Sequence, residues 1–371
     1  TLLVSKEPLG GILNAAGPLA HTAGLADGAP GADVAARLAA ALTNAPLERW
    51  CGEVRRLCPA STPSPLTSGE LPQAQAARGG TAQSPAPPLA DQNVGLNDPP
   101  AHWAVVDLHK RPTQPPTAKS EPTAPHGHQA TTSTREIWAR AVVVATGTIP
   151  RPYSPPGWEV VEKAGRAHRD LRSLPANLEG LHVVVVGGGD AAWDTALTIE
   201  ARGARTLLIH RSKRISAAKT LERKRNEKDI QLLSPRVLKA VEIVRGREVP
   251  REFEPKEPRL SHGAMEAIRI VLGSLEPEAS TKETEALFAH HVVACVGRSP
   301  LDTLLQNYGP FIHGSEGVLE GERGIFLAGD LVAGRQRYLL RALGSGQSAA
   351  IAAGRHVTRW NAILESEAKR G

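Results

Sequence analysis

The sequence predicts an α/β fold divided into two domains, and three observations lead to this prediction. First, residues 181–210 form a βαβ pattern, with a strand, a glycine turn, a helix and a second strand. Second, three further apolar strands end in glycine, at Gly147, Gly297 and Gly329. Third, prolines crowd residues 150–156 after the first of these strands, as in a crossover between domains. With 371 residues, the chain has room for two domains and a sizeable core.

The βαβ segment carries the clearest chemical motif. Its four consecutive valines predict a strand buried on both faces, and the turn after them has the spacing G-x-G-x-x-A. Glycine lets backbone approach a pyrophosphate, and the next helix directs its positive N-terminus at the phosphates. The motif therefore predicts a dinucleotide site made by Gly187, Gly188, Gly189, Asp190, Ala191 and Ala192. An ordinary glycine turn is the alternative.

The end of the second strand distinguishes between the two pyridine nucleotides. NAD sites usually carry an acidic residue there, which binds the ribose 2′-hydroxyl, whereas arginine suits the 2′-phosphate of NADP. This chain has no carboxylate at that point, and NADPH is therefore the expected cofactor. The residues expected to bind it are His210, Arg211, Lys213 and Arg214. A solvated basic loop is the alternative.

Composition excludes several classes of protein. The net charge of +6 fits a phosphate-bearing cofactor or an acidic protein partner. No basic run alternates with aromatic residues, so nucleic-acid binding is not expected. The three cysteines form no C-x-x-C pair, which predicts neither a disulfide framework nor a zinc site. No apolar run is long enough to span a bilayer and no signal-peptide pattern is present, so we expect no membrane partner and a cytoplasmic location.

The N-terminal part of the chain combines predicted strands, one helix and two inserts. The helix is expected over 31–50, and strands over 2–4, 103–108 and 137–145. Segments rich in Pro, Ala, Ser and Thr, at about 59–100 and 111–134, predict disordered insertions. The second insert would lengthen the turn of a hairpin between the last two strands. Two histidines in it, His126 and His128, have no further ligands nearby, so no metal site is predicted.

The C-terminal part continues with further strands and a final helix. Strands are expected over 237–244, 267–272, 291–297 and 324–328, and a helix over 344–357. The strand that ends at Gly297 marks the return crossover between domains. Cys295 lies inside this apolar strand, which predicts an inert core thiol.

Taken together, the motifs resemble one family. Four of them occur in the order seen in pyridine nucleotide–disulfide oxidoreductases, namely Ala145–Gly147, Gly187–Ala192, Val296–Gly297 and Ala328–Asp330. The chain resembles the small branch of that family, the thioredoxin reductases and the ferredoxin–NADP reductases of thioredoxin-reductase type. The resemblance implies two Rossmann-like, three-layer domains. The FAD domain would be split between 1–150 and 289–371, with the NADPH domain, 151–288, inserted into it.

The same resemblance assigns residues to the two cofactors. Asp330 would accept a hydrogen bond from the FAD ribityl chain, and a helix-capping role is the alternative for it. The FAD set is Ser5, Glu7, Gly10, Gly11, His21, Ala145, Thr146, Gly147, Gly329, Asp330, Arg335 and Gln336. Val296 and Gly297 join the NADPH set. The glycine fingerprint for FAD is not in the sequence, and we expect it upstream of Thr1.

One departure from the family bears on function. Thioredoxin reductases carry a redox C-x-x-C just before the NADPH strand, whereas residues 165–180 of this chain contain no cysteine. The resemblance then favours hydride transfer from NADPH to FAD and electron delivery to ferredoxin or flavodoxin, by a homodimer. Such transfer depends on alignment and exclusion of water, so no catalytic acid or base is assigned. The crossovers at 150–156 and near Gly297 would be hinges between the domains.

Other functions stay open at this point. One is a divergent thioredoxin-reductase-like enzyme or a reductase of low-molecular-weight disulfides, which needs a cysteine upstream of Thr1. Another is a non-catalytic, nucleotide-binding redox sensor that engages partners through the inserts.

Overall fold

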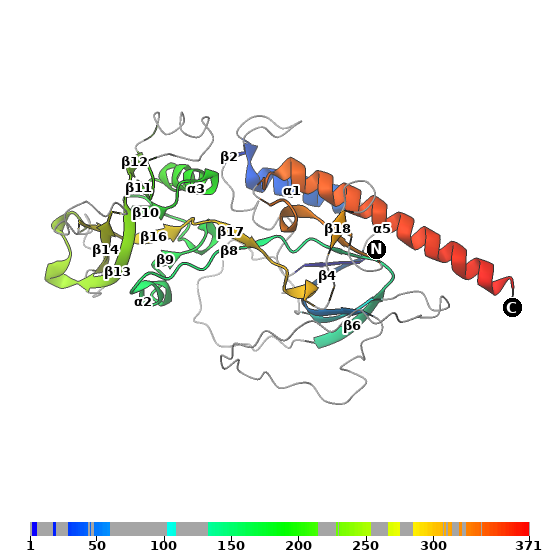
Figure 1. Cartoon of the computed structure of the whole chain (residues 1–371). Helices are drawn as coiled ribbons and strands as arrows, with labels where there is room; N and C mark the ends of the chain where they lie inside the picture. The colour runs from blue at the N-terminus through cyan, green and yellow to red at the C-terminus, as the bar shows by residue number, and fades with distance from the viewer. Residues whose placement is uncertain are drawn as a thin grey trace, which may run out of the picture. The chain divides into compact units, whose positions relative to one another are not determined.

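The computed structural model describes residues 2–5, 18–19, 29–43, 45, 48–59, 102–108, 133–213, 228, 230–253, 266–274, 285–306, 308, 311–313, 319–320, 324–334 and 336–370. The chain divides into two units, whose elements are labelled in Figure 1. Unit 1 comprises Thr1–Pro8, Pro46–Gly147 and Pro300–Gly371, and unit 2 comprises Leu9–Ala45 and Thr148–Ser299. The domain boundaries expected from the resemblance stay a prediction.

A five-stranded parallel sheet forms the middle of unit 2. Its strand order is β12-β11-β10-β16-β9, and every neighbouring pair is parallel. The strands are β9 (Ala167–His168), β10 (His182–Val186), β11 (Arg205–Ile209), β12 (Ile230–Leu233) and β16 (His291–Ala294). All four valines of β10 are buried, as the unbroken apolar run predicts.

Helix α3 (Asp190–Ala201) covers one face of this sheet. Trp193, Ala196 and Ile199 of the helix pack in one cluster with Val183 and Val185 of β10. Full burial of such side chains contributes roughly 1.5–3 kcal/mol each. Val183 and Val185 of β10 therefore lie on the face of the sheet that helix α3 covers.

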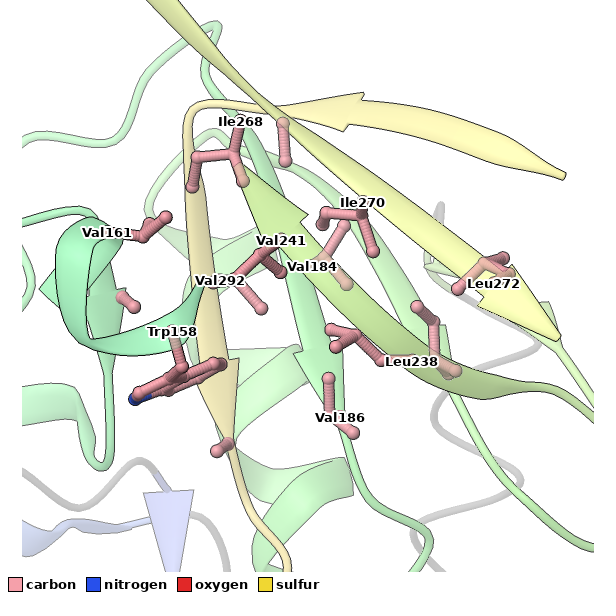
Figure 2. Packing of buried hydrophobic residues seen from close by; sticks show 14 residues of the cluster. Trp158, Val161, Val184, Val186, Leu238, Val241, Ile268, Ile270, Leu272 and Val292 are labelled. Carbon is pink, nitrogen blue, oxygen red and sulfur yellow. The ribbon is translucent and has the colours of Figure 1, made fainter. Parts of the chain in front are cut away.

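A second, antiparallel sheet covers the opposite face. It consists of β13 (Val237–Arg245), β14 (Glu266–Gly273) and β15 (Ala286–Ala289), and helix α2 (Trp158–Lys163) packs beside it. Figure 2 shows Val184 and Val186 of β10 directed into this cluster, with Ile270 and Trp158 nearby. Unit 2 is thus a three-layer structure, and the predicted α/β class is confirmed.

Unit 1 contains two four-stranded sheets. The first has the order β1-β4-β5-β6, with β1 (Leu2–Ser5), β4 (Glu48–Pro59), β5 (His102–Leu108) and β6 (Ser133–Ala139). The second has the order β18-β19-β20-β7, with β18 (Ile312–His313), β19 (Leu319–Glu320), β20 (Ile325–Leu327) and β7 (Val142–Val144). A core cluster that includes Leu57, Tyr308 and Ile325 joins strands of both sheets. The long helix α5 (Leu339–Ala368) packs on Phe326 of β20 through Ala349.

The remaining elements are one further helix and several short strands and turns. They are β2 (Pro18–Leu19), β3 (Ala29–Pro30), α1 (Gly31–Thr43), β8 (Thr148–Pro150), β17 (Arg298–Pro300) and the single turns η2 (Leu171–Ser173), η3 (Gly246–Glu248), η4 (Arg251–Phe253), η5 (Thr303–Leu305) and η7 (Gly329–Leu331).

Three sequence predictions differ from the structure. The helix expected over 31–50 ends at Thr43, because the chain from Glu48 onward pairs with β1 and β5 as strand β4. The strand expected over 137–145 is two strands, β6 and β7, separated at Arg140 and Ala141. The final helix is longer than expected and runs from Leu339 to Ala368.

The hairpin expected around the second insert is present. Strands β5 and β6 are antiparallel and bring Trp103 opposite Trp138. Most of the two predicted inserts, 60–100 and 109–132, lies outside the described residues.

The two predicted crossovers lie side by side. Strands β8 and β17 pair, and the Arg151 amide donates to the Gly297 carbonyl at 3.0 Å. The Arg298 guanidinium reinforces the pair by donating to Oγ1 of Thr148 at 2.8 Å and to its carbonyl at 2.6 Å. The two crossover segments are therefore hydrogen-bonded to each other along this stretch.

Candidate dinucleotide sites

The carboxyl ends of three neighbouring strands bring the predicted NADPH residues together. The glycine turn follows β10, the basic segment follows β11, and Val296 and Gly297 follow β16. Because β10 lies between β11 and β16 and all three are parallel, these segments meet at one edge of the sheet. Strand order reverses at β10, and ligands of open α/β sheets bind at such a switch point.

Neighbouring backbone makes Gly187 necessary. Its φ is +150°, and a Cβ there would lie 2.3 Å from the Cys295 carbonyl oxygen. The Cys295 amide donates to the Val186 carbonyl at 2.7 Å, so β16 is held against the turn. Ala192 is fully buried against the same turn, as the close helix-to-strand packing of the motif requires.

The other two glycines have different surroundings. A Cβ on Gly188 would collide with the His210 ring, 1.9 Å from its Cδ2 atom. A Cβ on Gly189 would meet nothing within 4 Å, and Gly189 is the N-cap of α3 with no side-chain cap. Open space beside a helix N-terminus fits a pyrophosphate.

The basic segment after β11 divides into one buried and several exposed residues. His210 is buried and extends the strand ladder, since its amide donates to the Leu233 carbonyl and its carbonyl accepts from the Arg236 amide, each at 2.9 Å. Burial lowers the pKa of His210. Arg211, Ser212 and Lys213 are exposed, whereas Arg214 lies outside the described residues.

A hydroxyl that the sequence did not point to anchors this segment. Ser234 follows β12, and its Oγ donates to the Ser212 carbonyl at 2.7 Å. The two residues are 22 positions apart in the chain. No local pattern links them, and only the pairing of β11 with β12 makes the contact.

In unit 1, five of the FAD candidates lie at neighbouring strand ends in the same manner. Strands β7 and β20 are parallel neighbours, and the Ala328 amide donates to the Val144 carbonyl at 3.0 Å. The segments Ala145–Gly147 and Gly329–Asp330 therefore follow adjacent strand ends. Gly147 and Gly329 have φ values of +70° and +73°, and a Cβ on either would meet nothing within 4 Å. This glycine-lined edge fits a cofactor that approaches the backbone closely.

Asp330 has no long helix directly after it, and the remaining FAD candidates lie apart from these strand ends or outside the described residues. Asp330 lies in the short turn η7, and α5 begins only at Leu339, so no long helix starts directly at the carboxylate. The Gly329 amide donates to Oγ of Ser345 in α5 at 2.9 Å. Ser5 ends β1 in the other sheet and is half-buried, and Gln336 is exposed. Glu7, Gly10, Gly11, His21 and Arg335 lie outside the described residues.

The cysteine-free segment forms an edge of unit 2. His168 of β9 is buried, and its ring nitrogens lie 3.0 Å from Oγ of Ser173 and 3.0 Å from Nδ1 of His291. Burial lowers the pKa of His291 to about 4 and also lowers that of His168. A hollow of about 290 Å³, lined in part by His168, Asp170 and Ser173, opens beside this chain of hydrogen bonds.

The structure also bears on the state of Cys295, on metal binding and on membrane-spanning helices. Burial raises the pKa of the Cys295 thiol to about 11, as an inert core thiol requires. Within the described part of the chain, no group of three His, Cys, Asp or Glu residues could hold a metal ion. His126 and His128 are outside that part. No helix among the described residues is long and apolar enough to cross a membrane.

Comparison with known proteins agrees with this architecture. The family model "Pyridine nucleotide-disulphide oxidoreductase" matches residues 117–352. The bifunctional thioredoxin reductase/thioredoxin of Mycobacterium leprae is 27% identical over 225 residues, which are 58% of this chain and 43% of that protein. The ferredoxin–NADP reductase of Gluconobacter oxydans is 38% identical over 91 residues, 24% of this chain and 26% of that protein. The alignment thus spans less than half the length of either relative.

A solved structure extends the likeness in fold to nearly the whole chain. Thioredoxin reductase of Lactococcus lactis matches with a TM-score of 0.63 and 16% identity, covering 97% of this chain and 91% of that one. That likeness supports two Rossmann-like domains. Because the family model covers well over half of the sequence, the chain belongs to the pyridine nucleotide–disulphide oxidoreductase family, in its thioredoxin-reductase-like branch.

Proposed function

We propose that this chain belongs to an FAD-dependent NAD(P)H oxidoreductase that delivers electrons to ferredoxin or flavodoxin without using a dithiol. FAD and NADPH are its cofactors, a choice that family membership supports. When bound, the two cofactors would supply the redox chemistry, in which a hydride from NADPH would pass to FAD and electrons would leave FAD singly. The protein's part is to bind, orient and shield the two cofactors.

The NADPH site in this proposal is the carboxyl edge of the parallel sheet in unit 2. Gly189 and the N-terminus of α3 receive the pyrophosphate, since a Cβ at this glycine would meet nothing within 4 Å. Arg211 and Lys213 bind the 2′-phosphate, and no carboxylate stands among 210–213 to repel it.

The FAD site in this proposal is the glycine-lined edge of unit 1. Gly147 and Gly329 allow close approach, and Asp330 accepts a hydrogen bond from a hydroxyl of the cofactor. Glu7, Gly10, Gly11, His21 and Arg335 complete the set as a prediction from sequence.

The choice of electron acceptor rests on the side chains present in residues 165–180. Where thioredoxin reductases are expected to hold a dithiol, this chain has a hydrogen-bonded Ser173–His168–His291 row and no cysteine. These side chains cannot exchange disulfides. The proposal therefore excludes thioredoxin as acceptor and names a one-electron carrier, with a cytoplasmic homodimer as the working form.

The test compares acceptors with the complete protein supplied with FAD. NADPH oxidation is followed with ferredoxin, with flavodoxin, with thioredoxin plus a chromogenic disulfide, and with a redox dye. We expect rapid turnover with a one-electron carrier and with the dye, and none above background with thioredoxin. Thioredoxin turnover would overturn the choice of acceptor. Failure of every acceptor, including the dye, would indicate a non-catalytic nucleotide sensor.

A further inference from the structure

We propose that Ser234 is a positioning residue that sets the preference of unit 2 for NADPH over NADH. The proposal rests on the proposed function, because it concerns the same nucleotide site. Ser234 touches no part of the nucleotide in this proposal. It acts through the backbone of the segment that carries Arg211 and Lys213.

The contact is specific and spans two strands. Oγ of Ser234 donates to the carbonyl of Ser212 at 2.7 Å, a short distance for a neutral hydrogen bond. Ser234 is half-buried at the end of β12, whereas Ser212 is exposed beyond the end of β11. A residue that directly follows a strand of the sheet thus binds the backbone in the middle of an exposed segment.

A second anchor holds the start of the same segment. The backbone of His210 is bonded on both sides, to Leu233 and to Arg236. Up to His210, the chain is therefore an extension of β11 on the sheet. Beyond His210, the side chains of Arg211, Ser212 and Lys213 are all exposed. The hydrogen bond from Ser234 to the Ser212 carbonyl restrains the backbone of this segment.

The position of Ser212 explains why this bond matters for phosphate binding. Ser212 lies between the two cations, so a fixed carbonyl restricts the backbone angles that aim both side chains. An oriented pair of cations binds a phosphate more tightly than a loose pair, because less conformational entropy is lost on binding. NADH has no 2′-phosphate, and its binding does not use this orientation.

The experiment uses the complete protein with Ser234→Ala and Ser234→Thr. Threonine keeps the hydroxyl and is the rescue variant. Ser366→Ala is the matched control, since Oγ of Ser366 also donates to a backbone carbonyl at 2.7 Å, that of Ile363, but in α5 of unit 1. Dissociation constants for NADPH, NADH, 2′,5′-ADP and ADP are measured by titration calorimetry, and thermal unfolding reports on the fold.

A neutral hydrogen bond of this kind corresponds to a change of about 3- to 10-fold in affinity. We expect S234A to weaken the binding of NADPH and of 2′,5′-ADP by that factor. The dissociation constants of NADH and ADP should stay within about twofold of those of the unaltered protein. S234T and S366A should behave as the unaltered protein does.

Each other outcome contradicts the proposal in a recognisable way. Equal weakening of all four nucleotides by S234A would mean that Ser234 supports the unit in general. Unchanged NADPH affinity in S234A would mean that the bond to Ser212 does not position the cations. If the unaltered protein bound none of the four nucleotides, the proposed function itself would fail, and this inference with it.

Discussion

The ring of His210 occupies the space next to Gly188 where a side chain would otherwise stand. A Cβ at residue 188 would lie 1.9 Å from Cδ2 and 2.0 Å from Nε2 of the ring. Gly188 is not one of the glycines with positive φ, so its backbone conformation alone would accept alanine. The histidine ring, rather than backbone strain, therefore makes glycine necessary, and it links the turn after β10 with the segment after β11.

This relationship predicts a compensating pair of substitutions. Gly188→Ala should lower the free energy of unfolding by about 1–3 kcal/mol, because the His210 ring is buried and has little space into which to withdraw. His210→Ala opens the space that the new methyl group needs. The double variant should then be more stable than the sum of the two single effects predicts, by urea unfolding. Simple additivity of the three measurements would contradict the contact.

Two glycines with similar backbone angles should respond differently to alanine. Gly157 and Gly165 have φ values of +82° and +70°. A Cβ on Gly157 would lie 1.7 Å from the Val241 carbonyl oxygen, whereas one on Gly165 would meet nothing within 4 Å. We expect Gly165→Ala to cost about 1–2 kcal/mol, the cost of a left-handed residue. Gly157→Ala should cost at least about 2 kcal/mol more, because α2 must move away from β13. Equal losses in urea unfolding would argue against the steric part of this account.

Three histidines, of which His168 and His291 are buried and His290 is half-buried, predict loss of stability in acid. Burial lowers the pKa of His290 and of His291 to about 4 each, and it also lowers the pKa of His168, against an ordinary value of 6.5. Asp170 and Glu162 oppose the shift at His168, whereas Arg166 adds to it at His290 and His291. The unfolded chain therefore takes up protons first as the pH falls. Stability should be fully present above pH 6.5 and decline from there toward pH 4.

Thermal unfolding at a series of pH values measures this decline. His291→Gln removes one titrating ring and keeps a polar side chain of similar reach. Its melting temperature should fall less steeply over the same interval, even if it starts lower at neutral pH. A curve parallel to that of the unaltered protein would show that His291 contributes nothing to the pH dependence.

The pairing of β8 with β17 should loosen when Arg298 is shortened. Its guanidinium donates to both oxygens of Thr148, and Arg298→Ala removes both bonds. The amides of Arg151 and Leu301, which donate to the carbonyls of Gly297 and Gly147, should then exchange with solvent about tenfold faster. Thr148→Val removes only the hydroxyl bond and should have a smaller effect. Unchanged exchange in R298A would mean that the backbone pairs suffice to hold β8 and β17 together.

Local sequence patterns determined most of the fold of unit 2. The four valines and the glycine turn specify a buried strand, a tight turn and a helix within about twenty residues. These elements can therefore be predicted from neighbouring residues alone. Gly147, Gly297 and Gly329, which follow the other apolar strands in the sequence, all have positive φ in the structure.

Tertiary structure decided what depends on long-range contacts. Residues 48–50 were expected to end a helix, yet they begin β4 because β1 and β5 offer hydrogen bonds along that strand. His210 stays a predicted NADPH residue, and only the strand pairing shows that its ring lies against Gly188. Ser234 carries no sequence signal at all, since its partner lies on another strand. A sequence motif predicts the local structure of a few adjacent residues. The direction in which each side chain points depends on which strands become neighbours in the sheet.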